Sequence, residues 1–206
     1  MRRVAYDELP FGFSWAPDEA FMRTSHALQA GGRVWLVDPV DVPEAIERAA
    51  SLGRAAGVLQ LLDRHRRDCA AIAARLGVPH LRLPAAVPGS PFAVVPVLRV
   101  PGWHEIALWW PERRALVVAE LVGTNDFFSL GGGQAGVHPA LRLPAPGALR
   151  GYEPEHLLVG HGRGVHGPAA AEALAGAYSR ARKDLPRLAG RLPAMLSAVV
   201  ARRRPR

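Results

Sequence analysis

The sequence contains little cysteine, little lysine and no long apolar run. One cysteine among 206 residues, Cys69, can neither form an internal disulfide nor build an all-cysteine zinc site. No segment reaches the roughly 18 consecutive apolar residues that a membrane-spanning helix needs. The N-terminal segment lacks the apolar stretch of a secretory signal. We therefore expect a cytoplasmic protein that spans no membrane, in a compartment where a free thiol is stable.

Positive charge is plentiful, and nearly all of it is arginine. Lysine and arginine total 26 against 18 acidic residues, a formal net charge of +8, yet the one lysine is Lys183. Part of the excess lies in the basic C-terminal tail, residues 201–206, which could bind nucleic acid but is more often a solvated chain end. No basic surface with interleaved aromatic residues is evident, so nucleic acid is the less favoured partner.

The first half of the chain predicts alternating strands and helices. Apolar runs predict strands at 34–37, 57–62 and 80–83, and amphipathic stretches predict helices at 43–52 and 68–76. Such alternation favours parallel strand pairing through helical crossovers. With hydrophobic residues at 49% and charged residues at 21%, the composition predicts one globular domain over residues 1–200.

The second half predicts a different order of elements. Closely spaced strands predict an antiparallel meander, at 92–100, 105–110 and 115–118. A strand at 156–159 then precedes helices at 168–183 and 186–200. The apolar end of the last helix could cap the domain or form a dimer contact, so the sequence leaves a monomer and a homodimer open.

Polar residues that suit a site follow four of the apolar segments. Ser25–Asp38 has the form of a hairpin that ends in an aspartate, and Leu62 runs into a turn, Arg64-His65-Arg66-Arg67-Asp68-Cys69. Glu120 ends a third segment, and Gly160-His161-Gly162 ends a fourth. In this order the four resemble the motifs of the metallo-β-lactamase-fold hydrolases, over roughly residues 25–168. The resemblance implies an α+β fold, the four-layer αββα sandwich of that family.

The resemblance is incomplete at the metal motif of the family, His-x-His-x-Asp-His. With Asp68 aligned to its aspartate, Arg64 and Arg66 replace the first two histidines and Cys69 replaces the third. A guanidinium is protonated and offers no lone pair, so it cannot ligate a cation. The resemblance therefore implies that the usual dinuclear zinc site is lost.

Our first hypothesis is replacement of the metal charge by arginine. Arg64 and Arg66 would pair with Asp68 and Glu120 and would bind an anionic small molecule, because guanidinium groups match carboxylate and phosphate geometry. The other candidate ligand-binding residues are His104, Glu105 and His138, which follow or flank aromatic or glycine-rich segments.

The alternative hypothesis is a hydrolase that holds one divalent metal, with zinc as the preferred ion. The resemblance implies a ligand set of Asp68, Cys69, Glu120 and His161, which combines a thiolate, an imidazole and carboxylates. Asp68, Glu120, His161 and His65 would then carry catalysis on an ester, a lactone or a phosphodiester, with His65 as the acid or base. Cys69 fits equally well as a small buried apolar residue. A third hypothesis is a nucleic-acid-associated protein.

Overall fold

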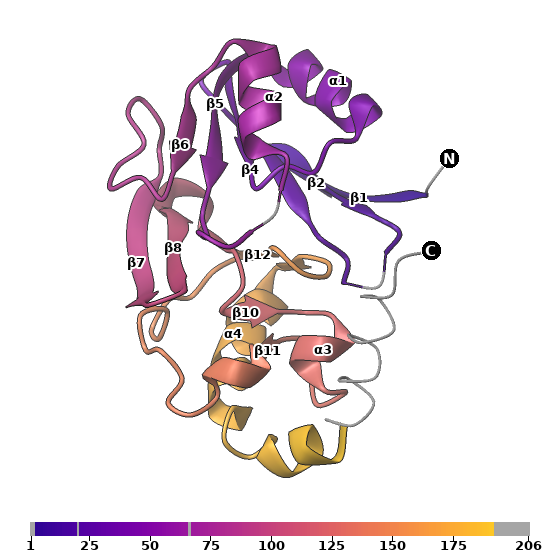
Figure 1. Cartoon of the computed structure of the whole chain (residues 1–206), viewed down its shortest axis with the longest axis vertical. Coiled ribbons are helices and arrows are strands. Elements are labelled where there is room, and N and C mark those ends of the chain that lie inside the picture. The colour runs from indigo at the N-terminus through magenta and orange to yellow at the C-terminus, as the bar shows by residue number, and fades with distance from the viewer. Residues whose placement is uncertain (1–2, 20, 66, 192–206) are drawn as a thin grey trace.

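The computed structural model describes residues 3–19, 21–65 and 67–191, which form two β-sheets stacked face to face with helices outside them (Figure 1). The first sheet has the strand order β1-β2-β3-β4-β5-β6. Its strands are β1 (Val4–Leu9), β2 (Gly12–Pro17), β3 (Ser25–Ala30), β4 (Arg33–Val37), β5 (Arg54–Gln60) and β6 (His80–Arg82).

The second sheet has the order β13-β12-β9-β8-β7. Its strands are β7 (Ala93–Val100), β8 (Trp103–Trp110), β9 (Ala115–Val118), β12 (His156–Val159) and β13 (Val165–His166). A separate two-stranded ribbon joins β10 (Val122–Gly123) to β11 (Gly136–Val137). The helices are α1 (Pro43–Leu52), α2 (Cys69–Leu76), α3 (Asp126–Ser129) and α4 (Pro168–Arg180), and short 3-10 turns cover Pro111–Arg113 and Pro139–Leu141.

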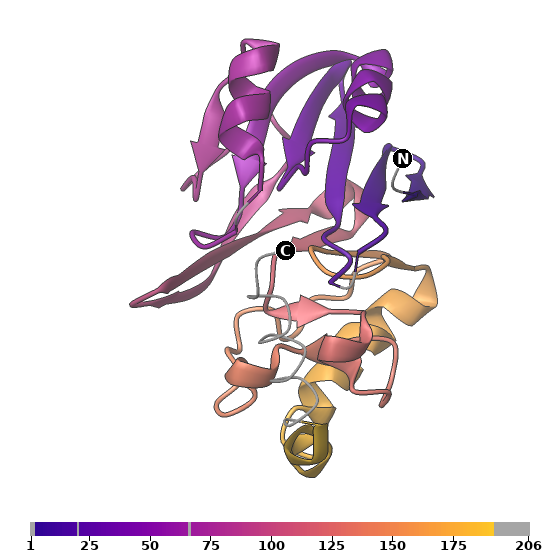
Figure 2. The ribbon, with the colours of Figure 1, turned by 45° about the vertical axis from the view of Figure 1, so that its right-hand side comes forward.

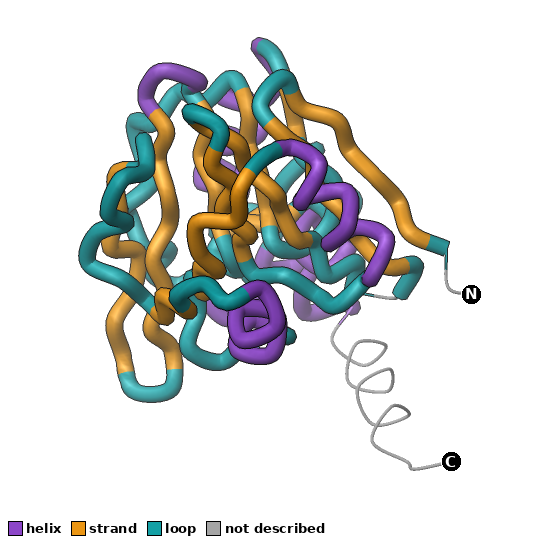
Figure 3. The backbone as a smooth tube through the Cα atoms, turned by 90° about the horizontal axis from the view of Figure 1, so that it is seen from above, coloured by secondary structure: helices purple, strands orange, loops and turns teal. Residues whose placement is uncertain are grey.

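Three apolar clusters correspond to the three interfaces of a four-layer sandwich. The cluster between the sheets joins Trp35 and Leu59 to Leu108 and Val117. A second cluster packs α1 and α2 against the outer face of the first sheet, and a third packs α4 against the second sheet. Figure 1 shows α1 and α2 beside the strands of the first sheet, Figure 2 shows α4 beneath the second sheet, and Figure 3 shows helices around the strands as seen from above. The four-layer αββα sandwich is therefore confirmed.

Helix signals in the sequence mark the ends of α1 and α2 correctly. Pro43 is at the first position of α1, where its missing N–H costs no hydrogen bond. Gly77 ends α2 in the left-handed region, with φ of 64°, and its N–H bonds back to the last turn. The parallel pairing of β4, β5 and β6 is confirmed as well.

Several elements differ from the prediction. The hairpin β1–β2 was not predicted, because polar residues and Pro10 interrupt its apolar pattern. The short elements β10, α3 and β11 were not predicted, and α4 ends at Arg180 rather than at 183. Of the expected helix 186–200, residues up to 191 are helical and the remainder lies outside the described residues, as does the 201–206 tail. No helix in the described part of the chain is long and apolar enough to cross a membrane.

The core between the sheets predicts the cost of one truncation. Leu59 is completely buried, so Leu59→Ala removes apolar contacts and leaves a cavity, and we expect it to lower the free energy of unfolding by about 2–5 kcal/mol. Urea denaturation measures this loss. Val100→Ala is the control, since Val100 is 48% exposed and its truncation is expected to change stability by no more than about 0.5 kcal/mol. Equal effects of both variants would contradict the layer assignment.

Candidate functional site

The candidate site lies where two pairs of parallel strands end. β4 pairs in parallel with β5 in the first sheet, and β9 pairs in parallel with β12 in the second. Parallel neighbours end at the same edge of a sheet, so the residues that follow these strands can meet there. Asp38, His65, Glu120 and His161 are the polar residues that do so, and their contacts join the two sheets.

Glu120 is the centre of this group. Its carboxylate lies 3.8 Å from Nε2 of His65, 3.6 Å from Nε2 of His138 and 3.4 Å from Nε of Arg64. The side chain is 17% exposed, so the carboxylate is partly accessible and lies between one guanidinium and two imidazoles.

Asp38 and His65 form a buried pair beside Glu120. Nδ1 of His65 lies 3.2 Å from Oδ2 of Asp38, and the other oxygen of Asp38 accepts the N–H of Leu61. Burial opposes ionisation of Asp38, but His65 and Arg67 outweigh it and hold the pKa of this carboxyl below its usual value. The His65 side chain is only 7% exposed, and neither ring nitrogen has a well-formed hydrogen bond. This imidazole is therefore held beside Asp38 with Nε2 directed at Glu120.

His161 is positioned by its ring nitrogen and by two glycines. Nδ1 donates to the carbonyl of Phe21 at 3.0 Å, which leaves the Nε2 lone pair free to face the site. Burial, reinforced by the charge of Arg67, lowers the pKa of His161 to about 3. A Cβ at Gly160 would collide with the carbonyl oxygen of Ala119, and Gly162 has φ of 103°. The Gly-His-Gly pattern is thus required by close backbone approach at this strand end.

His138 closes the opposite side of the site. Its Nδ1 accepts the N–H of Ala140, so the neutral ring carries its proton on Nε2, facing Glu120. Its ring packs edge-on against Trp103, with centroids 4.8 Å apart. Burial, and then the charge of Arg64, lowers the pKa of His138 to about 3.

Two arginines supply positive charge from opposite sides. Arg67 is partly buried and donates to the carbonyl oxygens of Thr24 and Gly160, at 3.3 and 2.8 Å, so it ties the end of the first sheet to the end of β12. Burial lowers the pKa of Arg67, and the charge of Asp38 opposes this shift. Arg64 is 40% exposed and lies over the ring of Trp103, with Cζ 3.5 Å from the centroid. An exposed guanidinium stacked in this way is pre-oriented for an anion.

Several solved structures have a similar fold, whereas no protein-family model and no curated protein matches the sequence. A structure of DIM-1 metallo-beta-lactamase superimposes with a TM-score of 0.58 at 14% identity, over 87% of this chain and 97% of that one. VMB-1 gives 0.57 at 10% identity, over 88% and 97%. TMB-1 gives 0.53 at 12% identity, over 89% and 99%. The chain has the metallo-β-lactamase fold. At these identities the likeness concerns the fold alone.

Not every residue predicted for the site of this metallo-β-lactamase-fold chain lies in it. Asp68 precedes α2 and accepts the N–H of Asp41 at 2.8 Å, on the outer side of the first sheet. Cys69 packs in the cluster under α1 and α2, and burial raises the pKa of its thiol. His104 on β8 is the strand partner of Arg99 on β7 and makes no contact with Glu120 among the described interactions. Arg66 lies outside the described residues.

Glu105 supports the site from below rather than lining its rim. It is completely buried on β8 and accepts N–H groups from Glu120, Leu121 and the Trp103 indole, at 2.8 to 3.0 Å. Burial raises the pKa of Glu105, against the lowering effect of these donors. Its carboxyl group therefore fixes the backbone at Glu120 and the ring on which Arg64 stacks.

The residues present do not fit the zinc pair that the fold resemblance implies. Asp68 accepts the N–H of Asp41 and Cys69 packs among apolar side chains under α1 and α2, and the guanidinium groups of Arg64 and Arg67 lie close to the remaining imidazoles. Within residues 3–19, 21–65 and 67–191, no group of three or more His, Cys, Asp or Glu side chains is arranged to hold a metal ion.

Two residues of the site, Asp38 and Arg67, were not predicted from the sequence to be functional. Asp38 was noted as the aspartate that ends a hairpin, and its position at the end of an apolar strand was a usable signal. Arg67 gave a weaker signal. The sequence does not show which arginine of the turn points inward, because that depends on the carbonyl groups it meets in the fold.

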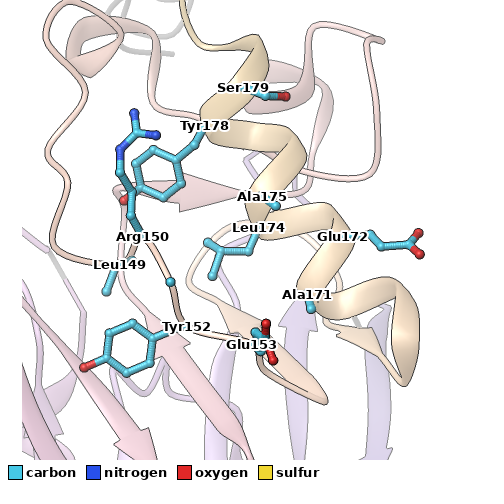
Figure 4. Close-up of a pocket in the computed structure, with 11 residues that line it drawn as sticks. Leu149, Arg150, Tyr152, Glu153, Ala171, Glu172, Leu174, Ala175, Tyr178 and Ser179 are labelled. Carbon is cyan, nitrogen blue, oxygen red and sulfur yellow. The ribbon is translucent and has the colours of Figure 1, made fainter.

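A separate pocket of about 470 Å³ lies on the far side of the second sheet (Figure 4). Tyr152, Leu174 and Tyr178 line it, and the guanidinium of Arg150 lies over the Tyr178 ring at 4.4 Å. None of the residues that contact Glu120 lines this pocket. It is therefore distinct from the candidate site.

The buried histidines predict a pH-dependent stability. Burial lowers the pKa of His26 to about 4 and of His138 to about 3, against 6.5 for an unperturbed histidine. Between pH 7 and pH 5 the unfolded chain therefore binds more protons, and stability falls as the pH falls. The loss is about 2 kcal/mol per histidine over this range. We expect His138→Gln to reduce the pH dependence of urea denaturation by about that amount. An unchanged pH dependence would contradict the burial of a neutral imidazole.

Arg67 predicts a second effect on stability. Arg67→Met removes two hydrogen bonds from a charged donor and the charge that faces Asp38, so we expect a loss of about 1.5–3 kcal/mol in urea denaturation. Arg54→Met is the matched control, because Arg54 is exposed at the opposite end of β5. A loss no larger than that of Arg54→Met would show that Arg67 does not tie the sheets together.

Proposed function

We propose that this chain is a divergent metallo-β-lactamase-fold protein that binds an anionic small molecule in a site without the usual pair of zinc ions. One observation carries the proposal. The carboxylates of Asp38 and Glu120 are compensated by Arg67, Arg64 and imidazoles of the chain itself. Positive charge that a metal would supply is thus supplied by side chains, and Arg64 takes the role assigned to it in the first hypothesis.

Arg64 is the group proposed to contact the anion. Its guanidinium is partly exposed and stacks on Trp103, and its contact with Glu120 at 3.4 Å is longer than a good charged hydrogen bond. A carboxylate or phosphate can therefore replace Glu120 as its partner with two parallel N–H···O bonds. His138, whose Nε2–H faces the same space, would donate to the ligand beside it.

His65 would supply acid–base chemistry if the bound molecule reacts. The carboxylate of Asp38 near Nδ1 favours the proton on that nitrogen and leaves Nε2 as a base. Glu120, 3.8 Å away, leaves room for a water or a substrate hydroxyl to approach both groups. The same site that binds the anion would thus also supply a general base, without a metal ion.

The alternative of a single-metal hydrolase is tested by metal content. Tag-free protein would be incubated with zinc, manganese and iron, dialysed, and analysed by plasma mass spectrometry. The proposal expects no metal that depends on His161, so the unaltered protein and His161→Ala are expected to retain the same metal content. About one tightly held metal, lost on His161→Ala, would favour the hydrolase of an ester, lactone or phosphodiester. Salt-sensitive binding to polynucleotides that survives deletion of 202–206 would favour the nucleic-acid alternative.

We also propose that residues 1–200 form one domain, present in the cytoplasm as a monomer or homodimer. The continuous apolar cluster between the two sheets supports a single domain, since strands from both halves of the chain contribute to it. The free, buried Cys69 is compatible with a reducing compartment.

The binding proposal predicts the effect of one substitution. Arg64→Gln is expected to weaken binding of an anionic probe about tenfold or more, because a charged hydrogen bond contributes about 1.5–3 kcal/mol. The probes are inorganic phosphate, pyrophosphate and citrate, measured by isothermal titration calorimetry in the presence of a chelator. Arg54→Gln, equal in charge change but at the far end of β5, is expected to bind as the unaltered protein does. Equal weakening of anion binding in both variants would show that the effect of Arg64→Gln comes only from the change in net charge.

A further inference from the structure

Two histidines face each other across β12 and β13, at the end of β12 opposite to the candidate site. His156 is the registered partner of His166 in this antiparallel pair. The N–H of Gly167 donates to the carbonyl of Glu155, so 155 and 167 form a hydrogen-bonded pair and 156 and 166 form the non-hydrogen-bonded pair beside it. Side chains are closest in pairs of this second kind. The strand register alone therefore brings the two imidazoles together.

The two rings direct the same nitrogen at each other. Nδ1 of His156 lies 3.0 Å from Nδ1 of His166. Two imidazole nitrogens on one metal ion, each at about 2.0 Å, are about 2.8 Å apart at a right angle and about 3.3 Å apart at a tetrahedral angle. The observed separation lies between these values, so one ion can bridge the two nitrogens once the rings turn both lone pairs toward a common point. A shared proton fits the same distance and would compete with the ion.

Groups around the pair hold both rings in this orientation. Nε2 of His166 donates to Oδ2 of Asp7 on β1 at 3.0 Å, which keeps the proton on Nε2 and leaves the lone pair on Nδ1. A Cβ at Gly164 would lie 2.8 Å from the His166 ring and 2.9 Å from the Asp7 carboxylate, so a glycine there leaves space for their contact. The His156 ring packs edge-on against Phe11, with centroids 5.1 Å apart.

We propose that His156 and His166 form a binding site for a divalent transition-metal ion, with Asp7 as the positioning residue of His166. Two imidazoles favour Cu²⁺ over Ni²⁺ and Zn²⁺, and they disfavour Mg²⁺ and Ca²⁺, which require oxygen ligands. In the described part of the chain no third protein ligand joins them, so water or an added ligand completes the coordination. Arg113 and Glu155 are the other charged groups that act on His156, with opposite sign.

The ion would also connect the two sheets. It is bound by β12 and β13 of the second sheet, and Asp7 of the first sheet orients one ligand. Because an ion that binds the folded state and not the unfolded state raises stability, Cu²⁺ or Zn²⁺ is expected to raise the melting temperature of this protein. This site is independent of Glu120 and of the anion proposed to bind there.

The test is Cu²⁺ binding by the tag-free protein, measured by calorimetry and by electron paramagnetic resonance. We expect one ion per chain with coupling to two imidazole nitrogens. His156→Gln and His166→Gln are each expected to lower the affinity at least about tenfold, and Asp7→Asn by about tenfold while retaining both nitrogens. His80→Gln is the control histidine, and His65→Gln tests the candidate site. Both are expected to bind as the unaltered protein does.

Three results would overturn the proposal. The first is unchanged affinity in both His156→Gln and His166→Gln. The second is loss of the ion in His65→Gln, which would place it at the candidate site. The third is a resonance spectrum of the unaltered protein without two coupled imidazoles, which would leave a shared proton as the whole role of the pair. This last measurement needs no variant, so misfolding of a variant does not affect it.

Discussion

Two carboxylates at one end of the sandwich, Asp38 and Glu120, need compensation of their charge within the protein. Isolated carboxylates there would be costly, because desolvation penalises charge. Arg67 and Arg64 provide positive charge, His65 and His138 face the carboxylates with ring nitrogens, and each of the four comes from a turn that follows or closes a strand. Arg67 has a structural role as well as an electrostatic one. Its donors hold backbone carbonyls from both sheets, so the same group that balances charge also fixes the spacing of the strand ends.

The apolar clusters explain why this end is rigid enough to hold such a group. β5 and β9 are buried on both faces near their carboxyl ends, where the central cluster meets the clusters under the outer helices. Residues that follow such strands have little freedom of direction, and Asp38 adds a left-handed backbone conformation, with φ of 44°. Glu105 adds to this rigidity, because its buried carboxyl group accepts the backbone N–H of Glu120 and fixes it in place. The site is thus held by hydrogen bonds to the main chain rather than by an ion.

Much of the fold could be predicted because its signals are local. Pro43 and Gly53 bound α1, Gly77 ends α2, and apolar runs mark β4, β5 and β9. The N-terminal hairpin had no such signal, and its formation depends on pairing with β3. At the site, Glu120, His65, His161, Arg64 and His138, which the sequence offered as separate candidates, lie close to one another. Asp68 and Cys69 do not lie with them, because Asp68 accepts the N–H of Asp41 and Cys69 packs under α1 and α2. The direction of a side chain at the start of a helix depends on packing that sequence order does not show.

The two ends of β12 show how surroundings decide the chemistry of one residue type. His161 follows the strand, where burial and Arg67 keep its ring neutral and a backbone carbonyl takes its N–H. His156 begins the strand, where burial lowers its pKa and a second imidazole faces it at hydrogen-bonding distance. Near His161 the neighbouring positive charge disfavours a cation. Near His166 the carboxylate of Asp7 favours one. A metal affinity that the fold resemblance assigns to one end of the strand is therefore better supported by the residues at the other.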